Sequence, residues 1–317
     1  MFINYAQTQQ QKEKENMENK KEKVELLKPK YDVVFQALFG QNEENITQSF
    51  ISDIIEKQIE IIDIKTDNTI ARKYPEDKIG RLDLKTKFKD GTICQIEMQL
   101  ANEKNIIDRI LYYWSKTFSN QLKRGDTFGK LTQTIGIVIV DFEIKEIKGI
   151  EKARTKWQIM ETEEGKKILT NKLELYIIEI PKAKRILEKE SNNKIAQWVS
   201  FIDDPNTERV EKIVENNKEV KKAREVLYGK SKDEELERLA FLKERTIMEE
   251  DSMREEAIEE GIEKGKKQGI QQGIQQGIQE GKRTSKLEMA KKMKNKKMLI
   301  SDIVELTGLT SEEIEKL

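Results

Sequence analysis

The sequence predicts an α/β fold, in which a mixed sheet flanked by helices is followed by a charged helical extension. Two neighbouring segments, residues 80–88 and 92–100, alternate polar and apolar side chains in the period-two pattern of half-buried strands. Residues 134–140 form an almost continuous apolar run, which is typical of a strand buried on both faces. Helical patterns occur before and after these strands, and such a mixture favours a layered α/β architecture.

The other elements of this domain are predicted from apolar spacing and from the residues that end each segment. Helices are expected over residues 31–39, 46–56 and 105–123 and around Trp198, and a further strand over residues 173–180, ended by Pro181. The helix at 105–123 has a broad apolar face, which predicts that it packs against the sheet.

The connection between the first two strands fixes their register. Residues 89–91 make a three-residue hairpin loop, and Gly91 can take the positive φ that such a loop needs. Phe88 then pairs with Thr92, so the numbers of paired residues sum to 180. This register places the apolar side chains on one face, whereas a two-residue loop would mix the two faces of a half-buried sheet.

The same register brings two acids together on the polar face. Asp83 lies opposite Glu97, and Gln99 follows Glu97 on the same strand. Like charges directly opposite each other destabilise a sheet unless something neutralises them. Hard oxygen ligands of this kind suit Mg²⁺ or Mn²⁺, so the pair is a candidate metal site. The alternative is a solvated hairpin face, in which the basic residues of segment 81–87 balance the acids.

An acid on one strand, followed by Glu-x-Gln on the next, resembles the active-site hairpin of PD-(D/E)XK nucleases. The surrounding sequence is similar to the recombination-promoting nuclease (Rpn) family, also described as PD-(D/E)XK nuclease family transposases. The similar blocks are residues 28–40, 80–84, 96–99, 108–116, 121–125, 134–142 and 172–181. Because these blocks occur in order at compatible spacing, the resemblance implies a PD-(D/E)XK nuclease-like core.

The resemblance also implies an activity, that of a Mg²⁺-dependent DNA endonuclease with Mn²⁺ as the alternative ion. Asp83 and Glu97 would bind the metal together with the backbone carbonyl of Met98. The metal would activate a water molecule and stabilise the charge that builds on the scissile phosphate. Gln99 would position that water, because an amide acts neither as a cation nor as a base at neutral pH.

Three further residues each have more than one interpretation on the family comparison. Lys85, two residues after Asp83 on the same face, would supply positive charge or would be a solvated strand lysine. Asp32 matches the acid of the family's first helix, and would complete the acidic cluster or cap that helix. Arg109 would bridge the acids, contact phosphate or form a structural salt bridge.

Composition narrows the remaining function classes. The chain of 317 residues is 36% apolar and 37% charged, so its core is expected to be concentrated in one part of the sequence. Basic and acidic residues each number 59, so attraction for DNA must come from a local patch. The lack of histidine excludes Ser-His-Asp and Cys-His triads, and a single cysteine excludes a Cys-only zinc site. That residue, Cys94, is expected to be a buried thiol.

The chain is expected to be cytoplasmic and to divide into five segments. It shows no signal peptide and no apolar run long enough for a membrane span, and its single cysteine fits a reducing compartment. The five segments are a disordered low-complexity arm (1–25), the nuclease-like domain (26–204), a charged helical region (205–257), a glycine repeat (258–284) and a helical hairpin (285–317).

The two C-terminal segments carry the signals for assembly. Glycine recurs at every fourth position from Gly261 to Gly281, which predicts a low-complexity spacer or, alternatively, a self-associating helix that makes a homo-oligomer. In the last segment, Gly308 ends one helix and Thr310 begins a capping box. The final helix is acidic, which favours a terminal hairpin over a DNA-reading helix.

Two other function classes remain open from the sequence. One is a catalytically silent nuclease-fold protein that binds DNA or another protein. The other is an assembly module, in which the C-terminal helices act and the sheet is a scaffold. The transposase description also implies strand transfer, for which the sequence shows no separate motif.

Overall fold

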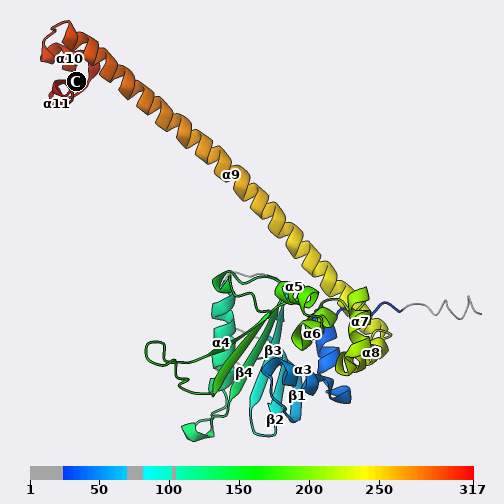
Figure 1. Ribbon diagram of the computed structural model, residues 1–317. Helices are drawn as coiled ribbons and strands as arrows, with labels where there is room; N and C mark the ends of the chain where they lie inside the picture. Colours follow the sequence, from blue (N-terminus) through cyan, green and yellow to red (C-terminus); the bar gives the residue numbers. More distant parts are fainter. Residues whose placement is uncertain (1–23, 70–80, 102–104) are drawn as a thin grey trace, which may run out of the picture. The chain divides into compact units, whose positions relative to one another are not determined.

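The computed structural model describes residues 24–69, 81–101 and 105–317, which form two compact units (Figure 1). The first unit extends to Ile247 and the second runs from Met248 to Leu317. The expected N-terminal arm lies outside the described residues, apart from its last two positions.

A six-stranded mixed sheet, with the strand order β1-β2-β3-β4-β6-β5, forms the centre of the first unit. Its strands are β1 (Ile61–Thr69), β2 (Arg81–Phe88), β3 (Ile93–Gln99), β4 (Thr134–Val140), β5 (Arg154–Gln158) and β6 (Leu173–Glu179). The first three strands are antiparallel, β3, β4 and β6 are parallel, and β5 runs antiparallel at the edge. The apolar run 134–140 is β4, which is buried at every position, as predicted.

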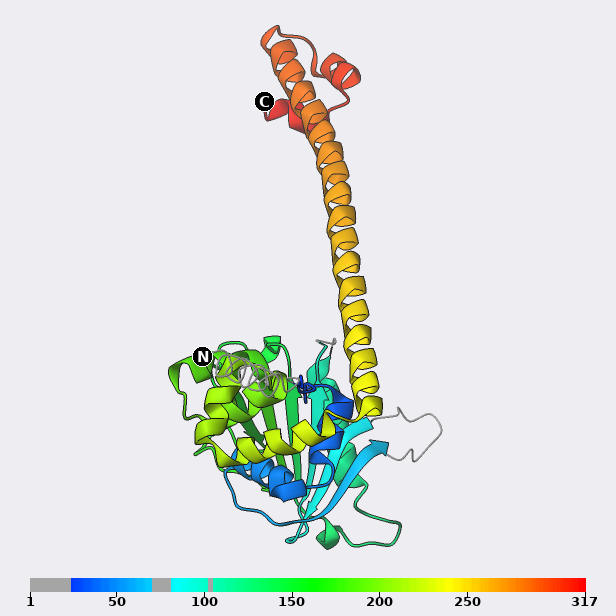
Figure 2. The same cartoon turned by 90° about the vertical axis from the view of Figure 1, so that its right-hand side faces the viewer.

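Helices cover both faces of this sheet, so the predicted α/β class with a PD-(D/E)XK nuclease-like arrangement is confirmed (Figures 1 and 2). One face is covered by α4 (Ile106–Ser119), whose apolar residues pack on β4 and β6. The helices on the other side are α2 (Asp32–Phe39), α3 (Ile46–Ile55), α5 (Ile180–Lys189), α6 (Lys194–Asp203), α7 (Glu208–Asn216) and α8 (Lys218–Lys230). Short 3₁₀ turns occur at Glu43–Asn45, Phe128–Lys130 and Lys145–Ile147.

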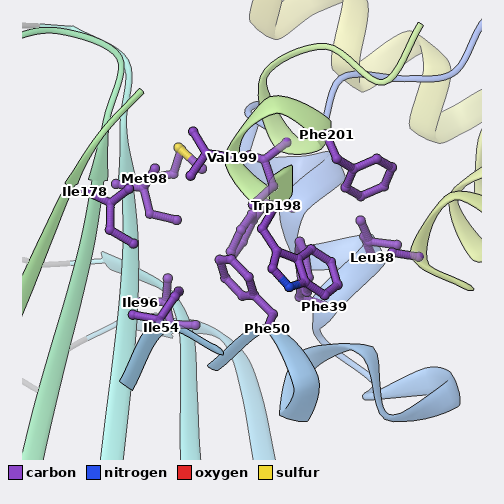
Figure 3. Close-up of a cluster of buried hydrophobic side chains, with 14 of the residues drawn as sticks. Leu38, Phe39, Phe50, Ile54, Ile96, Met98, Ile178, Trp198, Val199 and Phe201 are labelled. Carbon is purple, nitrogen blue, oxygen red and sulfur yellow. The ribbon is translucent and has the colours of Figure 1, made fainter. Parts of the chain in front are cut away.

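The larger core lies between the sheet and α2, α3 and α6 (Figure 3). The Phe50 ring centroid lies 5.0 Å from that of Phe39 and 5.4 Å from that of Trp198, so three helices meet at these rings. The buried thiol Cys94 belongs to the same core, as predicted. On the opposite face, a Cβ added at Gly136 of β4 would meet the Trp114 ring of α4 at 3.3 Å, which explains why a glycine stands in a buried strand.

Sequence patterns missed β1, β5 and α5. Strand β1 alternates charged residues with isoleucines, and β5 is short and half-exposed, so neither shows a long apolar period. The strand expected over residues 173–180 is β6, which ends at Glu179, and Pro181 lies in the first turn of α5 directly after it. Proline suits that position because the first helical residues need no N–H partner.

Helix α9 (Glu234–Asn295) begins in the first unit, where Ala240 is buried in the larger core. The glycine repeat lies within this helix, and its positions are exposed. In the second unit, α10 (Ile300–Thr307) ends at Gly308 with φ 67°, and α11 (Ser311–Glu315) begins at the Thr310 capping box, both as predicted. Within the described ranges, no helix is both long enough and apolar enough to cross a membrane.

Candidate active site

The hairpin of β2 and β3 has the predicted register. Leu84 pairs with Ile96 and Lys85 with Gln95, in agreement with Phe88 opposite Thr92. The Phe88 amide donates to the Thr92 carbonyl over 2.8 Å. Gly91 has φ 87° in the loop, so the positive-φ position that the sequence required is occupied by the residue that tolerates it.

At Asp83 the contact between β2 and β3 is made by a side chain and not by a backbone pair. Its Oδ2 atom accepts a hydrogen bond from the Met98 amide over 2.6 Å. The ladder pairs that the structure gives between these strands end at Leu84 and Ile96. Asp83 is therefore held against the end of β3, beside Glu97.

Burial and like charges together raise the pKa of Asp83 to about 7. Burial is the largest cause, because it penalises the charged carboxylate. The carboxylates of Asp32 and Glu97 raise this pKa further, whereas the Met98 amide and the Lys243 ammonium lower it. The charges of Asp32 and Glu97 thus act on the Asp83 carboxyl, and a bound cation would favour its ionised form.

Glu97 of β3 is held by an arginine from the covering helix. Its side chain is buried, with 5% of the residue exposed, and its Oε1 atom lies 3.3 Å from Nη2 of Arg109. Arg109 belongs to the first turn of α4, and its guanidinium lies 5.7 Å from the centroid of the Tyr113 ring. Arg109 therefore forms an ion pair with one of the two acids, and its role in the site, including a contact with phosphate, stays a prediction.

Asp32 begins α2 and is paired with a lysine from α9. Its Oδ1 atom accepts from the amide of the next residue, and its Oδ2 atom lies 3.1 Å from the Lys243 ammonium. The hydroxyl of Tyr31 donates to Glu244 over 2.7 Å, so a second bond fixes α9 beside the start of α2. Sequence patterns missed Lys243, because the contact joins positions 211 residues apart and nothing local distinguishes this lysine.

The two other predicted site residues lie near the acids in different ways. Gln99 is buried at the end of β3, with Nε2 3.5 Å from the carbonyl of Ala101. Lys85 lies opposite Gln95 on one side and Lys65 of β1 on the other. Burial and the neighbouring charge of Lys65 lower the pKa of Lys85, so the charge acting on it is that of another lysine.

The donor set fits a divalent ion by its chemistry. Carboxylates and a backbone carbonyl are the hard oxygen ligands that Mg²⁺ and Mn²⁺ prefer. Burial is the main reason why the pKa of Asp83 is raised, and the charges of Asp32 and Glu97 add to it, so a nearby cation would favour the ionised carboxylate. In the part of the chain that the structure describes, no three acidic or cysteine side chains converge as a metal cluster. Arg109 and Lys243 hold Glu97 and Asp32, and would compete with an ion for them.

Sequence comparison adds one match. The model of a family described as PD-(D/E)XK nuclease family transposase matches residues 29–260. The matched range includes Asp32, both strands of the hairpin, Arg109 and the part of α9 that carries Lys243. No curated protein and no solved structure matches the chain.

Proposed function

The chain belongs to the PD-(D/E)XK nuclease family transposases, and on this premise we propose that it is a metal-dependent endonuclease that hydrolyses phosphodiester bonds in DNA. Nucleases of this fold generally use divalent metal ions, and a nuclease of this family implies DNA as the substrate. The observation that carries the proposal is the pair Asp83 and Glu97, two neighbouring acids at the ends of β2 and β3, where burial and the charges of Glu97 and Asp32 raise the pKa of Asp83.

The metal would be Mg²⁺, with Mn²⁺ as the alternative, held by Asp83, Glu97 and the Met98 carbonyl. Such an ion supplies a nucleophilic water at neutral pH and electrostatic stabilisation of the reacting phosphate. Asp32 would join only on release from Lys243, because one of its oxygens accepts from that ammonium and the other from a backbone amide.

The chain's own residues orient this site. The Met98 amide fixes Asp83 by its hydrogen bond, and Arg109 fixes the rotamer of Glu97. Gln99 is neutral, so its role is to position a water molecule through its amide. Lys243 is the lysine whose charge acts on Asp83, and its ammonium would face the phosphate when Asp32 turns to the ion.

Cleavage of supercoiled plasmid in Mg²⁺ tests the proposal most simply. Asp83→Ala and Glu97→Ala should each lower the cleavage rate about 10³-fold, since a metal ion contributes several kcal/mol and each 1.4 kcal/mol is tenfold. Glu208→Ala is the matched control, because that α7 acid has 84% of its side chain exposed. Full activity in both site variants would overturn the proposed site. A gel shift without cleavage by the wild type would favour the catalytically silent DNA-binding alternative.

Self-association through α9 belongs to the same proposal. Four isoleucines of the glycine-repeat region, Ile262, Ile270, Ile274 and Ile278, are 53–66% exposed. At 100° per residue their positions fall within about 160° of one another, so they line one side of the helix. Exposed apolar stripes of this kind are buried by helix pairing. Sedimentation of the full chain and of Ile270→Gln/Ile274→Gln should show a shift to monomer, and unchanged sedimentation would refute pairing through this stripe.

A further inference from the structure

The polar face of β1 and β2 carries two lysines directly opposite each other. Lys65 of β1 pairs with Lys85 of β2. Side chains alternate along a strand, and Leu84 and Phe88 are buried in the larger core on the other face, so Lys85 shares the face of Asp83. Lys85 lies about 6.7 Å along β2 from Asp83, and the two lysine backbones are about 4.8 Å apart.

The covering helix leaves this part of the sheet open. Trp114 of α4 packs over Gly136 of β4, and Gly136 lies in the same row of the sheet as Gln95 and Lys85. This row of neighbouring residues, Gly136, Gln95, Lys85 and Lys65, crosses the sheet from the strand beneath α4 to the edge strand β1. At its outer end, 63% of the Lys65 side chain is exposed, and Lys87 further along β2 is exposed as well.

Three lysines, Lys65, Lys85 and Lys87, lie together on the described part of this face. The Asp63 carboxylate lies 3.8 Å from the Lys65 ammonium, and Asp63 pairs with Lys87 across the strands. Among the residues that the structure describes, the half-buried Lys85 side chain has no ion pair or hydrogen bond. Like charges directly opposite each other cost stability, and an anion between them removes that cost.

We propose that Lys65 and Lys85, supported by Lys87, bind the phosphate backbone of the DNA that enters the Asp83–Glu97 site. This inference rests on the proposed nuclease function and adds the path of the substrate. Lysines serve as point charges for phosphate and need no fixed bonding geometry. Their position, one step along β2 from Asp83, places backbone contacts next to the scissile phosphate.

Binding of a labelled DNA duplex, measured by fluorescence anisotropy in EDTA, tests this path without cleavage. Lys65→Gln and Lys85→Gln should each weaken binding roughly fivefold to tenfold at 0.1 M salt, and each should lower the slope of log K against log salt by about 0.9. Lys85→Arg should bind as the wild type does. Lys212→Gln is the control, because this α7 lysine has 73% of its side chain exposed.

Thermal unfolding of the same variants separates phosphate binding from a structural role. Removal of one lysine relieves repulsion, so Lys85→Gln should unfold at the same temperature as the wild type or a higher one. The inference is overturned if both glutamine variants bind within twofold of the wild type, or if the wild type itself does not bind DNA. Weakened binding in these variants, with no cleavage by any protein, would reject the nuclease function and keep the phosphate path.

Discussion

Two clusters of charged side chains in the first unit differ in the balance between acidic and basic residues. The active-site cluster contains the acids Asp32, Asp83 and Glu97 and the cations Arg109 and Lys243. The balanced cluster contains the acids Asp141 and Asp203 and the cations Lys30 and Lys184. In the balanced cluster, Asp203 lies 2.9 Å from the Lys30 ammonium and 2.6 Å from that of Lys184. Counted over the described residues, the first cluster has one more acid than cations, and the second has equal numbers of each sign.

The pKa directions follow from this difference. In the balanced cluster, burial alone would raise the pKa of Asp203, yet Lys184 and Lys30 hold it below its ordinary value. Burial alone would lower the pKa of Lys30, yet Asp203 and Asp141 raise it. Both groups are therefore stabilised in their charged forms. Asp83 is destabilised in its charged form, because burial and two acids outweigh the Met98 amide and Lys243. The balanced cluster stabilises the fold, whereas a carboxyl with a raised pKa, such as Asp83, is what the proposed metal site predicts.

The largest predicted contrast is in stability. Asp203→Asn should lower the free energy of unfolding by about 3 kcal/mol, because it leaves two cations with one acid in a mostly buried cluster. Asp83→Asn should not lower it, because the amide oxygen can still accept from Met98 while the repulsion is lost. Urea unfolding at pH 8 in EDTA measures both. Equal destabilisation by the two substitutions would remove the distinction between the clusters.

The second contrast is in pH dependence. Asp83 keeps its proton to about pH 7 in the folded state, whereas the unfolded carboxyl loses it near pH 4. The unfolded state then binds fewer protons, so this group lowers stability as pH rises from about 4 to about 7, by about 4 kcal/mol at about 1.36 kcal/mol per pKa unit. Asp83→Asn should abolish that fall in metal-free buffer. Asp203 acts in the opposite sense, because its pKa is depressed: its contribution is present above the unfolded pKa and is lost as pH falls through the folded pKa. The Asp83 account fails if wild type and Asp83→Asn give parallel stability curves between pH 4 and 7.

A double-mutant cycle tests the pairing inside the active-site cluster. Arg109→Gln should lower stability by about 1–2 kcal/mol, because it leaves the buried Glu97 carboxylate without its guanidinium. Adding Glu97→Gln should restore most of that loss, which gives a coupling energy of about 1 kcal/mol. Additive effects of the two substitutions would show that the contact contributes nothing.

Of these substitutions, Lys243→Gln should have the smallest effect on the free energy of unfolding. Its pair with Asp32 is partly exposed, at 37% and 36% of the side chains, so Lys243→Gln should cost less than about 1 kcal/mol. The same substitution should raise the pKa of Asp83 further, since the Lys243 charge lowers it. Carbon-13 NMR titration of the Asp83 carboxyl measures this shift. An unchanged or lower Asp83 pKa in the variant would show that the charge of Lys243 does not act on Asp83.

The sequence predicted the parts of the site that local patterns determine. Alternation along β2 and β3, with Gly91 between them, was enough to set Asp83 beside Glu97. The bond from the Met98 amide to Asp83 could not be predicted, because it depends on where the ladder ends. Lys243 could not be predicted either, since packing brings α9 to α2 across most of the chain.

Binding of Mn²⁺, measured by titration calorimetry at pH 7.5, tests the central claim most directly. The active-site cluster should bind the ion, and Asp83→Asn and Glu97→Gln should each weaken binding well over tenfold, because second-sphere changes alone cost 10–100-fold. Asp203→Asn should bind like the wild type wherever it is folded. If Asp83→Asn and Glu97→Gln bind Mn²⁺ as tightly as the wild type does, the acid pair is not the metal site.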